Sequence, residues 1–294
     1  MKWPMVLMAL SFGAGAASAQ VKVYISADME GIGGVVSGEQ LGTSGFEYQR
    51  FREFMTEEVL AAIRGARAAG ATEFLVSDSH GNGQNLLIEK LPDDVSVVRS
   101  WPRPLGMVEG IDETFACALF VGYHTSTSNP EGVRAHTFSS ATLTDVRLNA
   151  VSVSEAGFNA AVAGHFGVPV AMVTGDDAIV AEAKRYIGDL EGAVVKQALS
   201  FHSARTLTPA AAQRLIEETA RRAVERRASF RPFRLDGKVT LDVSFKNYRQ
   251  AEMLAYLPIV ERTDSHSIRF VGDDMIAISK FVQFMDGYET GLTP

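Results

Sequence analysis

The sequence predicts an α/β fold in which a mostly parallel sheet carries helices on both faces and is followed by a smaller α+β portion. Short apolar runs alternate with longer stretches of helical periodicity through about residue 205, and more charged segments replace this alternation afterwards. Strand–helix alternation favours parallel strands that are covered on both faces. The chain has 294 residues, of which 46% are hydrophobic and 21% charged, so it is long enough for one large or two modest cores.

The α/β portion is expected to be a metal-binding catalytic domain at residues 20–205. Its longest helix is expected at 48–70, where apolar residues recur every four positions and Gly70 provides a stop signal. Two shorter helices are expected at 155–167 and 177–188. The expected strands are the apolar runs Val21–Ser26, Glu73–Ser77, Val95–Arg99, Ala118–Gly122, Leu148–Val153 and Val168–Val173.

The smaller α+β domain is expected at residues 206–294. A charged amphipathic helix, Pro209–Arg227, opens it. Two short alternating runs then predict strands, and two apolar-periodic stretches predict helices. In chain order these are a strand at 238–245, a helix at 247–257, a strand at 267–272 and a helix at 273–285.

Residues 1–19 have the pattern of a secretory signal peptide. One positive charge, Lys2, precedes an apolar run, and small residues precede Gln20. A membrane anchor is the alternative, but the run is short and rich in glycine, and no stop-transfer segment follows it. We therefore expect cleavage and a periplasmic or secreted protein. No other stretch is long and apolar enough to span a bilayer.

Charge and cysteine content narrow the classes of partner. The formal net charge is −7, and loss of Lys2 with the signal peptide makes it more negative. Nucleic acid and anionic membrane surfaces are therefore not expected partners. The single cysteine, Cys117, excludes an internal disulfide framework. Because no disulfide can stabilise the fold, its stability must come from the hydrophobic core, with a metal ion or oligomerisation as further sources.

Acidic and histidine side chains gather where the predicted strands end. Asp28 and Glu30 follow the first apolar run, Asp78 and His80 the second, and His124 the fourth. Residues two apart in an extended segment point the same way, and open parallel sheets place their sites beyond the carboxyl ends of strands. Carboxylates and imidazoles converging there suit zinc, and a cation offsets the repulsion between carboxylates. Two more candidates, His136 and Glu155, follow in the sequence.

Each of these residues, and the set as a whole, also permits a different interpretation. Asp28 and Glu30 could cap a helix or lie in a solvated turn, Asp78 could serve a turn, and Glu155 could complement a helix dipole. Asp176–Asp177 after a strand, together with the acids after the first strand, is also similar to a haloacid-dehalogenase phosphatase. A periplasmic metal- or peptide-binding protein without catalysis could use the same ligands with no open coordination position.

The complete set of motifs resembles the bacterial zinc-dependent D-aminopeptidases, which enclose their active sites in a ring-shaped oligomer. The most specific motif is S-x-D-x-E-G, present here as Ser26-Ala27-Asp28-Met29-Glu30-Gly31. The motifs "DSHG", "GYH", "HTF", "SEAGFNA" and "GDD" follow in the order of that family. The resemblance covers nearly all of the mature chain.

The resemblance implies a centre of two zinc ions per subunit. Asp28 would bridge the ions, Glu30 and His124 would bind one, and His80 and Glu155 the other. His136 would be the catalytic residue, either shuttling a proton or stabilising the oxyanion. The implied activity is removal of an N-terminal amino acid, in this family a D-residue, from short peptides. The implied partner is a second copy of the chain in a homo-oligomer, specifically a ring-shaped decamer.

Overall fold

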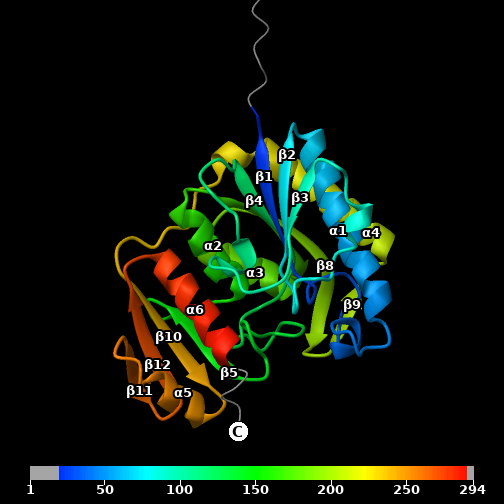
Figure 1. Ribbon diagram of the computed structural model, residues 1–294. Coiled ribbons are helices and arrows are strands. Elements are labelled where there is room, and N and C mark those ends of the chain that lie inside the picture. Colours follow the sequence, from blue (N-terminus) through cyan, green and yellow to red (C-terminus); the bar gives the residue numbers. More distant parts are fainter. Residues whose placement is uncertain (1–19, 290–294) are drawn as a thin grey trace, which may run out of the picture.

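The computed structural model describes residues 20–289 and has two sheets that share one core (Figure 1). The predicted signal peptide, residues 1–19, lies outside the described residues. Within the described part, no helix combines the length and the apolar character needed to cross a bilayer.

The larger sheet confirms the predicted parallel architecture. Its seven strands lie in the order β3-β2-β1-β4-β7-β8-β9, and every neighbouring pair is parallel except β8 with β9. Five of the predicted strands are present within a few residues of their expected bounds. The strands are β1 (Lys22–Ala27), β2 (Glu73–Asp78), β3 (Val95–Val98), β4 (Cys117–Tyr123), β7 (Val170–Asp176), β8 (Glu191–Ser200) and β9 (Ser203–Thr206).

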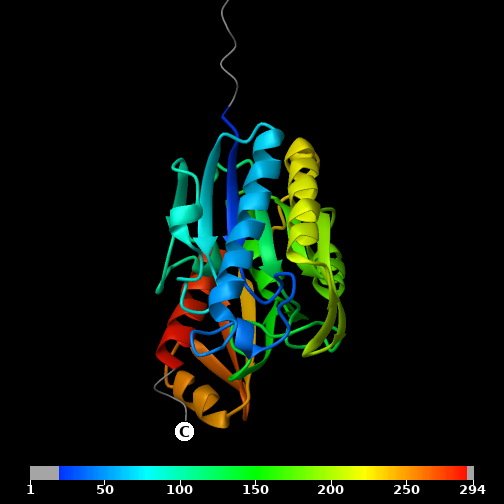
Figure 2. The ribbon, with the colours of Figure 1, turned by 90° about the vertical axis from the view of Figure 1, so that its right-hand side faces the viewer.

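Helices cover both faces of this sheet, as predicted. α1 (Tyr48–Ala68) and α4 (Pro209–Glu225) run side by side over one face (Figure 2). α2 (Glu155–His165) and α3 (Asp177–Ile187) lie over the other face (Figure 1). Alternate residues of β1 therefore enter different parts of the core: Val23 packs with the α1 side and Tyr24 with the α2 side.

The smaller sheet is antiparallel and has the order β11-β12-β10-β5-β6. The last helix, α6, packs against both α2 and this sheet. Short 3₁₀ turns occur at Gly38–Gln40, Ile88–Lys90, Gly106–Val108 and Arg227–Ser229. The remaining elements are β5 (Leu143–Leu148), β6 (Val151–Ser152), β10 (Val239–Phe245), α5 (Tyr248–Leu254), β11 (Val260–Asp264), β12 (Ser267–Gly272) and α6 (Met275–Glu289).

Two expectations about the division of the chain differ from this arrangement. The single strand expected at Leu148–Val153 is a hairpin, β5–β6, in the smaller sheet, because Asn149 and Ala150 turn the chain with positive φ angles of 48° and 67°. The helix α4, expected in the second domain, packs on α1 instead. A boundary near residue 205 therefore does not separate the two sheets.

Gly65 allows α1 and α4 to approach closely. A Cβ atom at this position would lie 2.0 Å from the carbonyl oxygen of Glu217. Because that obstacle is helix backbone, Gly65→Ala should lower the free energy of unfolding by about 1–3 kcal/mol, despite the better helix propensity of alanine. Thermal and urea unfolding measure the change. Glu53→Ala, on the exposed face of α1, is the control and should have little effect; equal stability of both variants would contradict the packing argument.

Candidate metal centre

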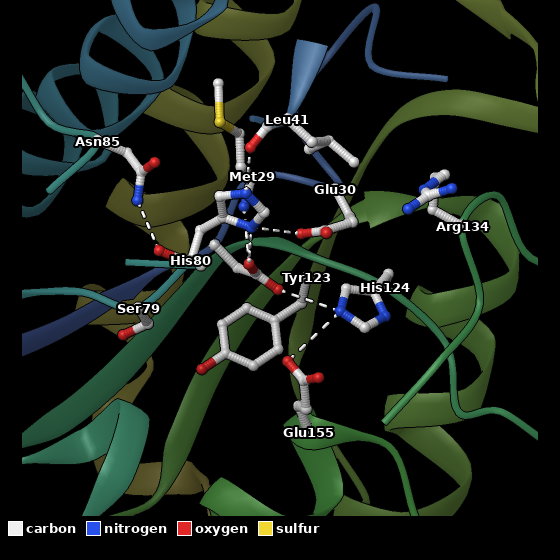
Figure 3. Close-up of polar contacts among 12 residues, drawn as sticks. Met29, Glu30, Leu41, Ser79, His80, Asn85, Tyr123, His124, Arg134 and Glu155 are labelled. Carbon is white, nitrogen blue, oxygen red and sulfur yellow. Dashed lines mark hydrogen bonds and ion pairs between the residues drawn. The ribbon is translucent and has the colours of Figure 1, made fainter. Parts of the chain in front are cut away.

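The strand ends do bring the predicted metal ligands together. Asp28 directly follows β1, His80 follows β2 and His124 follows β4, while Glu155 is the first residue of α2. β1 lies between β2 and β4 in the sheet, so Asp28 has a histidine on either side. Figure 3 shows the resulting cluster of carboxylates and imidazoles. All of these side chains are buried.

The two oxygens of Asp28 face two different groups of ligands. Oδ1 lies 3.4 Å from Nδ1 of His80, and the same nitrogen lies 2.9 Å from Oε2 of Glu30. Oδ2 lies 3.3 Å from Nε2 of His124, which is also 3.3 Å from Oε2 of Glu155. One carboxylate is therefore shared between two groups of possible ligands. Glu30 and His80 form the first group with Asp28, and His124 and Glu155 form the second, in which His136 also lies within reach of a shared ion.

The contacts in the structure pair two of these residues differently from the zinc ligand sets that the resemblance implies. Glu30 lies with His80, and Glu155 lies with His124, whereas the expected partners were exchanged. β2 and β4 flank β1 on opposite sides, so the two histidines approach Asp28 from different sides. Asp28 contacts both pairs.

Two buried atoms of the cluster show where a cation would fit. Oδ2 of Asp28 and Nε2 of His124 have no hydrogen-bond partner among the described residues, although both are shielded from solvent. Unsatisfied buried polar atoms are destabilising, and a cation placed between them would satisfy both. Imidazole nitrogens with carboxylate oxygens form a donor set that suits zinc. The residues present therefore fit the metal that the sequence predicts.

The histidine tautomers are fixed by backbone carbonyl groups behind the rings. Nε2 of His80 lies 2.8 Å from the carbonyl oxygen of Leu41, and Nδ1 of His124 lies 3.1 Å from that of Thr125. A carbonyl oxygen only accepts, so these ring nitrogens donate. The opposite nitrogen of each neutral ring then presents a lone pair to the cluster. Such outer hydrogen bonds orient metal-ligating histidines.

The ionisation of the cluster follows from charges held close together in a buried space. Burial and the charge of Glu30 raise the pKa of Asp28. Burial also favours neutral Glu30, but the charge and hydrogen bond of His80 and the charges of His136 and His124 together outweigh it and hold the pKa of Glu30 well below its usual value. Burial opposes the charge of His80 and His124, yet the neighbouring carboxylates hold the pKa of both imidazoles well above the usual value.

His136 occupies the space between the two ligand groups. Its ring stacks on His124 with centroids 4.0 Å apart, and its Nε2 lies 4.0 Å from Oε1 of both Glu30 and Glu155. Nδ1 lies 2.7 Å from the carbonyl oxygen of Arg134 and donates to it, which leaves the lone pair on Nε2. Burial and the charge of His124 lower the pKa of His136. Its surroundings therefore favour a neutral imidazole.

The S-x-D-x-E-G motif also contains residues that support the ligands. Ser26 donates to the carbonyl oxygen of Met107 and accepts from the hydroxyl of Tyr123. These hydrogen bonds fix the end of β1, directly before Asp28. At Gly31 a Cβ atom would lie 2.1 Å from the carbonyl oxygen of Tyr123, so only glycine allows the loop to approach β4. The motif therefore combines two ligands with the residues that seat them.

The remaining acids near the strand ends are structural in this arrangement. Asp78 accepts from the backbone N–H groups of Asn85 and Leu86 and belongs to neither ligand group. Asp176 caps the N-terminus of α3, which agrees with the capping interpretation. Asp176 and Asp177, the pair behind the phosphatase alternative, both lie outside the ligand groups.

A pocket of about 360 Å³ opens onto the ligands. Trp101, Met107 and Phe138 give it apolar walls, and Gln283 from α6 borders it from the smaller sheet's side. Trp101 and Gln283 were not predicted from the sequence. Trp101 follows β3 closely but has no acidic or imidazole group, and Gln283 lies on the last helix, outside the motifs. The volume is within the usual range for small-ligand pockets.

Comparisons with known proteins agree with this geometry. The peptidase family M55, described as D-aminopeptidase, matches residues 21–284. The chain belongs to this D-aminopeptidase family. A curated D-aminopeptidase of Bacillus subtilis (strain 168) is 38% identical over 260 residues, which cover 87% of this chain and 93% of the relative.

A solved member of the D-aminopeptidase family has the same fold. It is described as the Zn-dependent D-aminopeptidase DppA from Bacillus subtilis, a self-compartmentalizing protease. The TM-score is 0.87 at 36% sequence identity, and the match covers 92% of this chain and 97% of the other. The resemblance inferred from the S-x-D-x-E-G motif is thereby confirmed.

The raised histidine pKa values predict an unusual pH dependence for the protein stripped of metal. Because the pKa of His80 and of His124 exceeds the unfolded value of about 6.5, their contribution to stability is present below that pH and is lost as pH rises through the folded values. The free energy of unfolding of chelated protein should fall by about 1–3 kcal/mol from pH 6 to pH 8.

Chemical denaturation at several pH values measures this slope. His80→Gln should flatten it, whereas His165→Gln, at an exposed histidine far from the ligands, should not. Zinc should reverse the trend, since it binds unprotonated imidazole. Chelated protein that is more stable at pH 8 than at pH 6 would contradict the assigned ionisation.

Proposed function

We propose that the protein is a zinc-dependent aminopeptidase that removes an N-terminal D-amino acid from short peptides, using two zinc ions per subunit. The observation that carries the proposal is the shared carboxylate of Asp28, whose two oxygens face separate groups of ligands. Glu30 and His80 would hold one ion with Oδ1, and His124 and Glu155 the other with Oδ2. Membership of a peptidase family supports hydrolysis as the reaction.

The metal and the protein have separate tasks in this reaction. Bound zinc supplies Lewis acidity, which lowers the pKa of a water molecule and polarises a carbonyl group. His136 supplies proton transfer, because its Nε2 lone pair faces the space between Glu30 and Glu155. The lone pair can accept a proton from the attacking water, and the imidazolium so formed can protonate the leaving amine.

The geometry favours the general-base role of His136 over oxyanion stabilisation. An oxyanion needs a hydrogen-bond donor, and Nε2 carries no proton while Nδ1 donates to the carbonyl oxygen of Arg134. The lowered pKa of His136 keeps the ring neutral at the start of the reaction. The carbonyl of Arg134 also fixes the ring orientation and would stabilise the imidazolium as it forms.

The pocket walls are consistent with a small substrate that is partly apolar. Trp101, Met107 and Phe138 can contact an alkyl side chain, while the ligand groups lie at the pocket floor. Peptides of a few residues fit this scale, and long chains would meet α6. Selection for the D-configuration belongs to the proposal and rests on the family relationship.

Export and assembly complete the proposal. Residues 1–19 would direct the chain to the periplasm or outside the cell, where peptides from the cell wall contain D-residues. The solved relative is described as self-compartmentalizing, which supports a homo-oligomer, and a ring-shaped decamer is the specific expectation. Such a ring would restrict access to short peptides.

The test of the proposed function is a panel of D- and L-amino acid amides and dipeptides with purified zinc-loaded protein. We expect release of free D-alanine from D-alanine peptides, and loss of release after chelation and in Asp28→Ala, which removes the shared ligand. Zinc content is measured in parallel. Zinc binding without hydrolysis of any peptide would support the non-catalytic binding alternative, and full activity after exhaustive chelation would contradict the metal mechanism.

His136→Ala should separate catalysis from metal binding. Zinc content should stay near that of the wild type, because the assigned ligands are intact, while kcat should fall roughly 10²–10⁴-fold through loss of general acid–base catalysis. Steady-state kinetics and metal analysis measure the two effects. His202→Ala, at an exposed histidine, is the matched control. Unchanged kcat in His136→Ala would remove this residue from the mechanism.

A further inference from the structure

Lys196 on β8 is a buried cation that the reaction does not use. Its side chain is 2% exposed. The ammonium group donates to the backbone carbonyl oxygens of Glu30, Ile32 and Val35, at 3.2 Å for Ile32 and 2.7 Å for Val35. All three carbonyls belong to the loop that follows β1 and carries a metal ligand. The three N–H donors of a lysine match these three acceptors.

Further contacts hold the same loop from its N–H side. Gly31 donates to the carbonyl oxygen of Gly122, at 2.7 Å, and Gly33 donates to Oε1 of Glu58 on α1, at 2.9 Å. The loop has no regular secondary structure of its own. Besides hydrogen bonds within the loop, its backbone is held by β4, by Glu58 on α1 and by Lys196 on β8. Among the described residues, Lys196 is the one whose side chain donates to three of the loop's carbonyls.

We propose that Lys196 is a positioning residue for the metal centre, because its ammonium group fixes the backbone from which Glu30 reaches the ion. The side chain acts on the carbonyl groups and not on the carboxylate, so it leaves Glu30 free to bind zinc. The inference rests on the proposed zinc centre. A residue on β8, a strand that contributes no ligand, would therefore position one of the two ligand groups.

The surroundings keep the lysine charged despite its burial. Burial lowers the pKa of Lys196 to about 8, and the nearby carboxylates of Asp176 and Glu58 oppose that effect. Glu58 is itself buried, and one of its oxygens has no hydrogen-bond partner among the described residues. A buried lysine needs carboxylates nearby, because an isolated buried charge is strongly destabilising.

The variant Lys196→Met tests the proposal, because it retains most of the unbranched apolar stem and removes all three donors. Zinc affinity is measured by chelator competition on protein stripped of metal. We expect a 10–100-fold loss of affinity for the ion that Glu30 would hold, the usual effect of removing a residue that orients a metal ligand. Lys196→Gln retains two donors and should lose less.

Val195→Ala is the matched control, since Val195 is a fully buried neighbour on the same strand whose side chain has no hydrogen-bond donor for the loop's carbonyls. It should lower the melting temperature without changing zinc affinity. If Lys196→Met and Val195→Ala bind zinc as tightly as the wild type, the positioning role is wrong. Failure of the wild type to bind zinc would instead overturn the proposed function.

Hydrogen exchange of the wild type tests the proposal even if the variants do not fold. In protein stripped of zinc, the amides of Gly31 and Gly33 should stay protected, because protein groups and not the ion hold the loop. In a folded Lys196→Met variant this protection should be lost locally, while Val195→Ala retains it. Free exchange of these amides in wild-type protein without zinc would overturn the proposal.

Discussion

Three carboxylates share one buried space, and this constraint governs the rest of the site. Asp28, Glu30 and Glu155 repel one another where solvent cannot screen their charges. The neighbouring imidazoles offset part of this repulsion. One oxygen of Asp28 and one nitrogen of His124 nevertheless have no hydrogen-bond partner among the described residues. Ions that coordinate these atoms would convert a destabilising cluster into a stabilising one. The centre and the stability of the fold around it are therefore linked.

The parallel sheet provides the positions, but glycines and buried polar residues provide the precision. Gly31 and Gly122 let the ends of β1 and β4 approach more closely than any side chain would permit. Lys196 and Glu58 then satisfy the backbone groups of the loop between Glu30 and the following turn. A site built this way keeps its geometry through backbone contacts, which single ligand substitutions do not disturb.

The features of the site that depend on local spacing could be predicted from the sequence. Asp28 and Glu30 lie two residues apart at the end of an apolar run, and the site could be located from that pattern. The pairing of ligands depends on which strand lies on which side of β1, a tertiary property that spacing does not carry. The strand β8 was not predicted because charged and polar residues interrupt its apolar pattern. Lys196 is one of these, and a lysine directly after the apolar residues Ala193–Val195 is the signal that could have located it.

The route of the chain sets the order in which the site can be completed. The ligands all lie within residues 28–155, whereas Gln283 borders the pocket from the final helix, α6. A growing chain thus acquires its metal-binding groups long before it acquires a finished substrate chamber. The wall that α6 contributes comes from the last helix of the described residues, so an unfinished polypeptide has no complete pocket in which to cleave its neighbours.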